Sequence, residues 1–272
     1  MVSFFPSRTV ALSLFGFSVH WYGIMYLLAF LLALVLLPRL QRYRHLALTT
    51  DDWSGVLTGA VLGVLIGGRL GYVLFYDLPF YFSSPLEILK VWKGGMSSHG
   101  GFLGVGIAML IVSRQKRIPL LPLLDLLIVP TAIGLALGRI GNYINQELFG
   151  TVTSVPWAVS VHGFPGLRHP AQLYAVAKDL FIALVCFLQL RRTRQAGRPG
   201  KTLALFLILY GVLRFLVEYV RVQDYPTVEF FGIMLTRGQL YTIPIFLTGI
   251  FLWLWIRRRG ILEQQTIGVP ES

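Results

Sequence analysis

Seven stretches of mainly apolar residues, separated by short polar segments, dominate the pattern along the chain. A helix needs about 20 such residues to cross the hydrocarbon core of a bilayer. The third and fourth stretches are shorter than this, and a glycine-rich segment precedes the third. We therefore predict an all-α fold, a polytopic membrane bundle of seven transmembrane helices in a single domain over residues 1–272. The predicted spans are residues 16–38, 55–76, 98–113, 121–138, 173–190, 202–220 and 239–256.

Clusters of lysine and arginine follow every odd-numbered span. Cytoplasmic loops of membrane proteins carry an excess of these residues. We therefore predict that the N-terminus lies outside, on the periplasmic side, and the C-terminus in the cytoplasm. The clusters are Arg39, Arg42 and Arg44 after the first span, Arg114, Lys116 and Arg117 after the third, Arg191, Arg192, Arg194, Arg198 and Lys201 after the fifth, and Arg257, Arg258 and Arg259 after the seventh.

With this orientation the loops 77–97, 139–172 and 221–238 face outward. The middle loop contains proline, glycine and tryptophan, and we expect it to form a small periplasmic cap. Residues 260–272 are polar, and we expect a flexible cytoplasmic tail there, because chain ends without apolar contacts are poorly ordered.

Composition supports a membrane protein. The chain is 55% hydrophobic and only 13% charged, whereas soluble domains carry about 25% charged residues. The formal net charge of +12 is explained by orientation signals and contact with anionic lipid. We expect no nucleic-acid partner, because the basic clusters border apolar spans and no nucleic-acid-binding motif occurs.

The chain has one cysteine, Cys186, inside a predicted span. An intramolecular disulfide is therefore impossible, and we expect a buried, inert thiol. The first apolar stretch is longer than the core of a signal peptide, and basic residues follow it without a small-residue cleavage pattern. We interpret this stretch as a retained first span.

The run from Gly138 to Gly150 is the most unusual polar segment. Arg139 follows a long apolar stretch, and two asparagines, a glutamine, a glutamate and three glycines surround it. A charge at the edge of a span marks a candidate functional site. An arginine reaching lipid phosphates from the interface would explain Arg139 alone, but not its polar neighbours.

One face of the predicted sixth span is polar. Tyr210, Arg214, Glu218 and Arg221 are spaced 4, 4 and 3 residues apart, which places them within roughly an 80° arc of a helix. A structural ion pair between Arg214 and Glu218 is one interpretation. Arg221 then adds positive charge, and such a face suits an anionic headgroup.

A glycine-rich segment, Gly94 to Gly101, precedes the third span and contains His99. Its glycines permit close backbone approach, and the amides at the start of the following helix can face an anion. A lone histidine is commonly structural. Together with two arginine sites, His99 is instead a candidate for proton transfer.

Three further polar positions adjoin the spans. Arg69 lies deep in the second span and needs a carboxylate or phosphate partner; we expect a structural ion pair. Near the start of the first span, Trp21 fits an interfacial aromatic belt, whereas Tyr22 is a candidate to point inward. Before the fifth span, His169 and Gln172 either complete a polar site or cap the helix.

Several reaction classes lack sequence support. Few carboxylates occur inside spans, namely Asp125, Glu218 and Asp179, so proton or ion transport is not indicated. No His-Glu-x-x-His zinc motif and no Gly-x-Ser-x-Gly nucleophile elbow is present. Arginine, asparagine, tyrosine and histidine near the outer face are instead typical of a site for a phosphate ester at the membrane surface.

These motifs resemble those of the prolipoprotein diacylglyceryl transferase family of bacterial inner membranes, in order and spacing from about residue 18 to 242. Tyr143, Ser98 and Ala175 depart from the family pattern, which commonly has phenylalanine, an aromatic residue and glutamate there. The motifs are Gly138-Arg139-x-Gly141-Asn142-Tyr143-x-Asn145-x-Glu147-x-x-Gly150, His20-Trp21-Tyr22-Gly23, Gly94-Gly95-Met96-Ser97-x-His99-Gly100-Gly101, His169-Pro170-x-Gln172-Leu173-Tyr174, and Tyr210-Gly211-x-x-Arg214-Phe215-x-x-Glu218.

The resemblance implies a reaction and its partners. The diacylglyceryl group of phosphatidylglycerol is transferred to the thiol of the lipobox cysteine in a prolipoprotein signal peptide. A thioether forms and glycerol 1-phosphate leaves, as the first step of lipoprotein maturation. The resemblance also implies no metal and no cofactor, and a multi-pass protein of the bacterial inner membrane with its active site toward the periplasm.

On this basis we expect His99, Arg139 and Arg214 to be catalytic. His99 is the candidate base for the thiol, Arg139 grips the lipid phosphate, and Arg214 stabilises the charge of the leaving group. We expect Asn142 and Tyr22 to bind the headgroup, Tyr210 to orient Arg214, and Glu147 and Glu218 to hold arginines. Asn145, Gly150 and Arg221 complete the expected substrate-binding set.

Two other functions fit the same composition. A phospholipid transporter or flippase would use the arginines to conduct headgroups without chemistry, but transporters commonly contain two related halves, and no such repeat is visible. A structural scaffold would pair its arginines with Glu218, Glu147 and Asp77.

Overall fold

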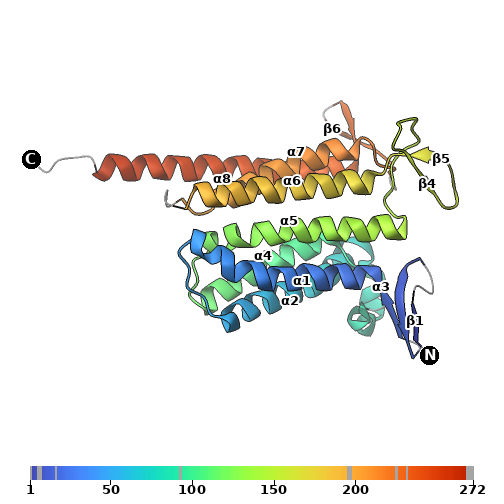
Figure 1. The fold of residues 1–272 in the computed structure, drawn as a ribbon, viewed down its shortest axis with the longest axis horizontal. Coiled ribbons are helices and arrows are strands. Elements are labelled where there is room, and N and C mark those ends of the chain that lie inside the picture. Colours follow the sequence, from blue (N-terminus) through green and yellow to red (C-terminus); the bar gives the residue numbers. More distant parts are fainter. Residues whose placement is uncertain are drawn as a thin grey trace, which may run out of the picture. The chain divides into compact units, whose positions relative to one another are not determined.

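The computed structural model describes residues 2–4, 8–15, 17–91, 94–194, 198–223, 226–230 and 232–267. Most of these residues are helical (Figure 1). The chain forms two compact units, one of residues 37–124 and the other of residues 1–36 and 125–272. Organisation as a single domain stays a prediction.

The unit of residues 37–124 is built on two helices that approach closely. Helix α2 (Thr50–Tyr76) packs along α4 (Ser98–Gln115). A Cβ atom added to Gly67 would lie 2.4 Å from the carbonyl oxygen of Gly100, so the two backbones touch there. Small residues permit such contacts between membrane helices. The unit also contains η1 (Gln41–Tyr43), α3 (Leu78–Ser83) and η2 (Pro85–Leu89).

In the other unit α6 (Ala171–Arg192), α7 (Lys201–Glu218) and α8 (Arg237–Ile267) run side by side, with α7 in contact with both neighbours (Figure 1). The start of α7 is held by Asp125 of α5 (Leu120–Asn145). This fully buried carboxylate accepts the N–H groups of Gly200 and Leu203, each at 2.8 Å. Hydrogen bonds and the positive end of the helix dipole compensate its burial.

Helix α1 (Trp21–Leu40) approaches α5 within the same unit. A Cβ atom at Gly134 would lie 3.3 Å from the Cβ of Ala29, and one at Gly141 would lie 3.4 Å from the ring of Tyr22. The glycines of α5 therefore leave room for α1 side chains. This contact brings Tyr22 to the polar end of α5.

In the described part of the chain, three small antiparallel sheets accompany the helices, and the apolar pattern did not predict them. The predicted start of the first span at residue 16 is wrong, because residues 17–20 form a strand that pairs with its neighbour before α1 begins. The sheets are β1 (Val2–Phe4), β2 (Val10–Leu14) and β3 (Phe17–His20) in that order; β4 (Val159–Val161) with β5 (Phe164–Arg168); and β6 (Val228–Phe230) with β7 (Ile233–Leu235).

Among the described helices, five are long and apolar enough to cross a membrane. Helix α4 has a shorter apolar part, and α7 carries three charged residues in 18. A mainly helical, multi-pass membrane protein is therefore confirmed, while seven spans and their orientation stay predictions. The five candidate spans are Trp21–Tyr43, Thr50–Tyr76, Leu120–Asn145, Ala171–Arg192 and Arg237–Arg259.

The end of the predicted fourth span is wrong. Residues 139–145, expected in a loop, continue α5 as a helix to Asn145. Hydrophobicity marks only where a helix can leave lipid, whereas the helix itself ends where Gln146 takes a left-handed conformation with φ of 58°. At the other end of the chain, α8 reaches Ile267, and residues 268–272 of the predicted tail lie outside the described residues. Cys186 is fully buried, as expected.

Candidate active site

Four basic side chains of the described residues line one cavity at the end of α5, α6 and α7. Arg139 comes from α5, Lys178 from α6, Arg214 from α7, and Arg221 from the segment after α7. The cavity, here called the arginine cavity, has about 330 Å³ of space free of atoms, its open mouth included. Its other lining residues are Leu148, Ala171, Gln172, Ala175 and Val217.

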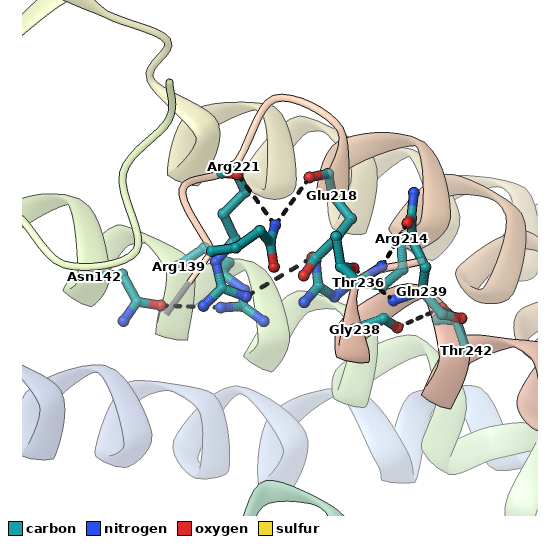
Figure 2. A network of polar contacts seen from close by, with 10 residues as sticks. Arg139, Asn142, Arg214, Glu218, Arg221, Thr236, Gly238, Gln239 and Thr242 are labelled. Atoms are coloured by element: carbon teal, nitrogen blue, oxygen red, sulfur yellow. Dashed lines mark hydrogen bonds and ion pairs between the residues drawn. The ribbon is translucent and has the colours of Figure 1, made fainter. Parts of the chain in front are cut away.

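Glu218 holds two of these cations. Its carboxylate forms an ion pair with Arg214, one turn earlier on α7, and Oε2 lies 3.8 Å from Nη1 of Arg221 (Figure 2). Arg139 instead donates to Oδ1 of Asn142 at 3.2 Å. Within the described part of the chain, no carboxylate lies within 4.0 Å of Arg139. The cavity therefore keeps positive charge that its own carboxylates do not neutralise.

The start of α8 packs against the carboxylate of Glu218. Gly238 lies directly against the carboxylate, because a Cβ atom added there would be 2.2 Å from Oε1 of Glu218 (Figure 2). Two reciprocal hydrogen bonds hold the start of this helix. The side chain of Gln239 accepts the N–H of Thr236 at 3.0 Å, and the hydroxyl of Thr236 accepts the N–H of Gln239 at 3.0 Å, which is a capping box.

A relay of hydrogen bonds reaches Arg139 from α1. The hydroxyl of Tyr22 donates to Oε2 of Glu147 at 3.2 Å, and the amide of Asn142 donates to the same hydroxyl. The other end of that amide, Oδ1, accepts from Arg139. Tyr22 does point inward, but Tyr22 and Asn142 support Arg139 from outside the cavity lining. Glu147 contacts Tyr22 and Asn145, so in the described residues it holds no arginine, contrary to expectation.

Lys178 is the site residue that sequence reasoning missed. It is 7% exposed and forms a buried ion pair with Asp179. Its Nζ lies 4.5 Å from the centre of the Tyr210 ring. An ionisable residue inside an apolar span was the available signal. Asp179 is named above as a carboxylate inside a span, but the adjacent Lys178 is not named there.

His169 and Gln172, at the start of α6, have different surroundings. Nδ1 of His169 lies 3.1 Å from the hydroxyl of Tyr174, which also accepts the indole N–H of Trp157 at 2.6 Å. Gln172, in contrast, is 4% exposed and lines the arginine cavity. Its Nε2 donates to the carbonyl of Glu147 at 2.7 Å. Gln172 therefore fits the polar-site interpretation, whereas His169 contacts Tyr174 and no side-chain hydrogen bond caps the start of α6 in the described residues.

Three expected substrate contacts have other positions. Tyr210 stacks on Phe206 with ring centres 5.6 Å apart and lies under Lys178, and no hydrogen bond joins it to Arg214 in the described residues. Asn145 donates to Glu147 at 3.1 Å. Gly150 packs against the main chain of its neighbours, because a Cβ atom there would lie 2.5 Å from the carbonyl oxygen of His169. These three residues shape the site from outside the cavity lining.

Two predicted residues belong to the unit of residues 37–124. The backbone of His99 lies in the first turn of α4, and its side chain is outside the described residues. Arg69, expected in an ion pair, is bonded to main-chain carbonyl oxygens instead. Carbonyl oxygens of a surrounding loop accept hydrogen bonds from the N–H donors of this guanidinium. They belong to Glu87 at 2.5 Å, Gly94 at 2.6 Å, Ile88 at 2.8 Å, Gly95 at 3.1 Å and Lys90 at 3.4 Å.

The chain leaves α5 through two strained residues. Gln146 and Leu148 have φ of 58° and 54°, in the left-handed region that side chains other than glycine rarely adopt. Leu148 lines the arginine cavity. Backbone strain of this kind costs about 1–3 kcal/mol and concentrates at functional sites.

Comparison with known proteins identifies the family of this chain. Residues 9–255 match the family model described as prolipoprotein diacylglyceryl transferase. A protein of Geobacter sulfurreducens named phosphatidylglycerol–prolipoprotein diacylglyceryl transferase is 44% identical over 89% of this chain and 92% of its own length. A protein of the same name from Vibrio atlanticus is 41% identical over 94% of this chain and 95% of its own. The chain belongs to the prolipoprotein diacylglyceryl transferase family.

Proposed function

We propose that this chain transfers the diacylglyceryl group of phosphatidylglycerol to the thiol of a prolipoprotein, the first step of lipoprotein maturation. Family membership supports the reaction, and the names of the relatives give both substrates. The acceptor is the lipobox cysteine next to the signal peptide. The observation that carries the proposal is the convergence of Arg139, Lys178, Arg214 and Arg221 on one cavity.

The charge of the cavity matches the chemistry. A phosphodiester carries one negative charge, and the leaving phosphate monoester gains a second as the bond to carbon breaks. Hydrogen-bond donors that are already in place lower the activation barrier when they bind the transition state more strongly than the ground state. Removing one such donor from an active site costs about 2.7–4 kcal/mol. Arg139, whose charge has no carboxylate partner in the described chain, is the principal phosphate ligand.

The reaction is a displacement at carbon. The thiol sulfur attacks the glyceryl carbon that bears the phosphate ester, and a carbon–sulfur bond forms. The carbon–oxygen bond breaks, its electron pair stays on the phosphate oxygen, and glycerol 1-phosphate leaves. The thiol proton passes to a base. Arg214, held by Glu218, stabilises the charge that develops on the leaving oxygen.

The surrounding residues position the arginines. Glu147, Tyr22 and Asn142 form the relay that orients Arg139. Asn145 holds the other oxygen of Glu147, and Tyr210 lies beneath Lys178. Arg221 adds a second cation beside Glu218.

His99 is the proposed base for the thiol. A free thiol has a pKa of about 8.5 and an unperturbed histidine about 6.5, so the imidazole is available to take the proton near neutrality. An arginine-rich cavity also favours thiolate without a base. His99→Gln separates these routes, because it keeps most of the activity only if the arginines suffice.

The enzyme works from the periplasmic face of the bacterial inner membrane, with seven spans and a cytoplasmic C-terminus. The basic clusters after the odd-numbered spans support this orientation. The β4–β5 hairpin belongs to the proposed periplasmic cap. Both substrates are anchored in the bilayer, so lateral entry suffices and no large soluble domain is required.

The test is transfer in proteoliposomes. Purified protein is mixed with phosphatidylglycerol and a peptide that contains a lipobox cysteine, and mass spectrometry follows the thioether adduct. We expect the adduct with the wild type and a loss of about 100- to 1000-fold with Arg139→Ala. Arg139→Ala must show the wild-type melting temperature for the comparison to count.

Two outcomes would overturn the proposal. Folded wild type that forms no adduct with any anionic lipid, yet moves fluorescent lipid between leaflets, would identify a transporter. Equal activity in the wild type and Arg139→Ala would remove the arginine cavity from the reaction.

A further inference from the structure

A second cavity adjoins the arginine cavity in the same unit. It has about 250 Å³ of space free of atoms, its open mouth included. We call it the side cavity. Five of the seven described residues that line it are polar. The seven are Arg8, Tyr143, Gln146, Val159, Ser160, Val161 and Gln172.

Among the described residues, Gln172 is the one side chain that lines both cavities. It is 4% exposed, and its Nε2 is fixed by the carbonyl of Glu147. Its Oε1 is buried and has no hydrogen-bond partner in the described structure. A buried acceptor without a partner is costly. Its position between two cavities suggests that a ligand group supplies the missing donor.

The chemistry of the lipid identifies that group. In phosphatidylglycerol the phosphate is bonded directly to the headgroup glycerol, so a phosphate in the arginine cavity places two hydroxyl groups a few bonds away. Resting on the proposed function, we propose that the side cavity binds the headgroup glycerol and that Gln172 accepts a hydrogen bond from one of its hydroxyls. The leaving glycerol 1-phosphate therefore occupies both cavities.

The lining of the side cavity agrees with a neutral polyol. Tyr143, Gln146 and Ser160 bring hydroxyl and amide groups. Tyr143 lines this cavity with a phenol side chain, whose hydroxyl can be removed without loss of the ring. Arg8 is fixed at the same cavity by a bond from Nε to the carbonyl of Ile144 at 2.5 Å. Its positive charge disfavours a headgroup that ends in an ammonium group.

The experiment compares two lipids in the proteoliposome assay. One is phosphatidylglycerol, and the other is phosphatidylpropanol, which has the same anionic phosphodiester and the same three carbons but no headgroup hydroxyl. We expect kcat/KM of the wild type to favour phosphatidylglycerol by about tenfold, the worth of one or two hydrogen bonds. In Gln172→Met this ratio should fall to about two or less.

The ratio of kcat/KM on the two lipids distinguishes a loss of headgroup recognition from a general loss of folded enzyme. Loss of the bond between Gln172 and Glu147 lowers the rate on both lipids equally and cancels in the ratio. Gln189→Met, the same exchange elsewhere on α6, should leave the ratio at the wild-type value. If Gln172→Met does not fold, Tyr143→Phe decides in the same way, because it removes only a hydroxyl from the side cavity.

Each outcome has one meaning. A ratio that falls in Gln172→Met or Tyr143→Phe supports the proposal. A wild type that uses both lipids equally, or variants that lose rate but keep the ratio, would overturn it and leave the transferase function intact. A wild type that transfers from neither lipid would overturn the proposed function itself.

Discussion

Arg214 and Glu218 form an ion pair one turn apart on α7, with side chains 16% and 2% exposed. Two interpretations of this pair make different predictions. A structural pair stabilises α7 and contributes nothing to chemistry. A catalytic Arg214 uses Glu218 as a support and carries its charge to the phosphate.

Neutralising both partners distinguishes the two interpretations. Breaking a buried pair by removing one partner costs about 3–5 kcal/mol of stability, whereas removing both leaves neither charge of the pair alone. Arg221 then loses only a 3.8 Å contact with Glu218. We expect Arg214→Gln/Glu218→Gln to melt near the wild-type temperature yet to be as inactive as Arg214→Gln alone, by about 100-fold or more. Recovery of activity in the double variant would identify a purely structural pair.

A larger residue at Gly238 should lower activity, because Gly238 lies against the carboxylate of Glu218. A methyl group at this position would lie 2.2 Å from the carboxylate oxygen, so Gly238→Ala should displace Glu218 and the two arginines around it. We expect kcat to fall about tenfold or more. Gly138→Ala is the matched control, since nothing lies within 4 Å of the added atom, and it should keep full activity beside Arg139.

Lys178 should contribute to phosphate binding as well as to its pair with Asp179. Lys178→Met leaves a buried carboxylate alone and should lower the melting temperature. Adding Asp179→Asn should restore stability, but KM for phosphatidylglycerol should stay about tenfold above the wild type. A double variant with wild-type KM would limit Lys178 to a structural role.

Removing the hydroxyl of Tyr22 should weaken the relay to Arg139. Tyr22→Phe removes the partner of the buried Asn142 Nδ2 group, at about 1–3 kcal/mol for an unpaired buried donor. Glu147 loses one hydrogen bond and keeps the one from Asn145. We expect kcat/KM to fall about tenfold with little change in melting temperature. Tyr26→Phe, one turn later on the exposed side of α1, is the control, and an equal loss there would contradict a specific relay.

The proposed orientation can be measured with single cysteines. Cys186 is fully buried, so Cys186→Ala provides a background without reactive thiols. His162→Cys at the tip of the β4–β5 hairpin should react with an impermeant maleimide added outside intact spheroplasts. Gln115→Cys, at the end of α4, should react only after lysis. The reverse pattern would invert the orientation.

The sequence by itself determined the helical membrane class and most of the polar residues of the site. Apolar length alone identifies membrane helices, because lipid leaves the backbone no partner but itself. The polar face of α7 was visible because helical spacing is regular: Arg214 and Glu218 are paired as their separation of four indicates. The motif around Arg139 also carried the family resemblance.

Tertiary structure decided which polar groups meet. Arg69 and Arg139 look alike in the sequence as charges at apolar segments, yet Arg69 is enclosed by main-chain carbonyls and Arg139 opens to a cavity. The same is true of Lys178, which joins the site only because α6 packs on α7. Contacts between distant segments depend on how helices pack, and spacing along one chain contains no such information.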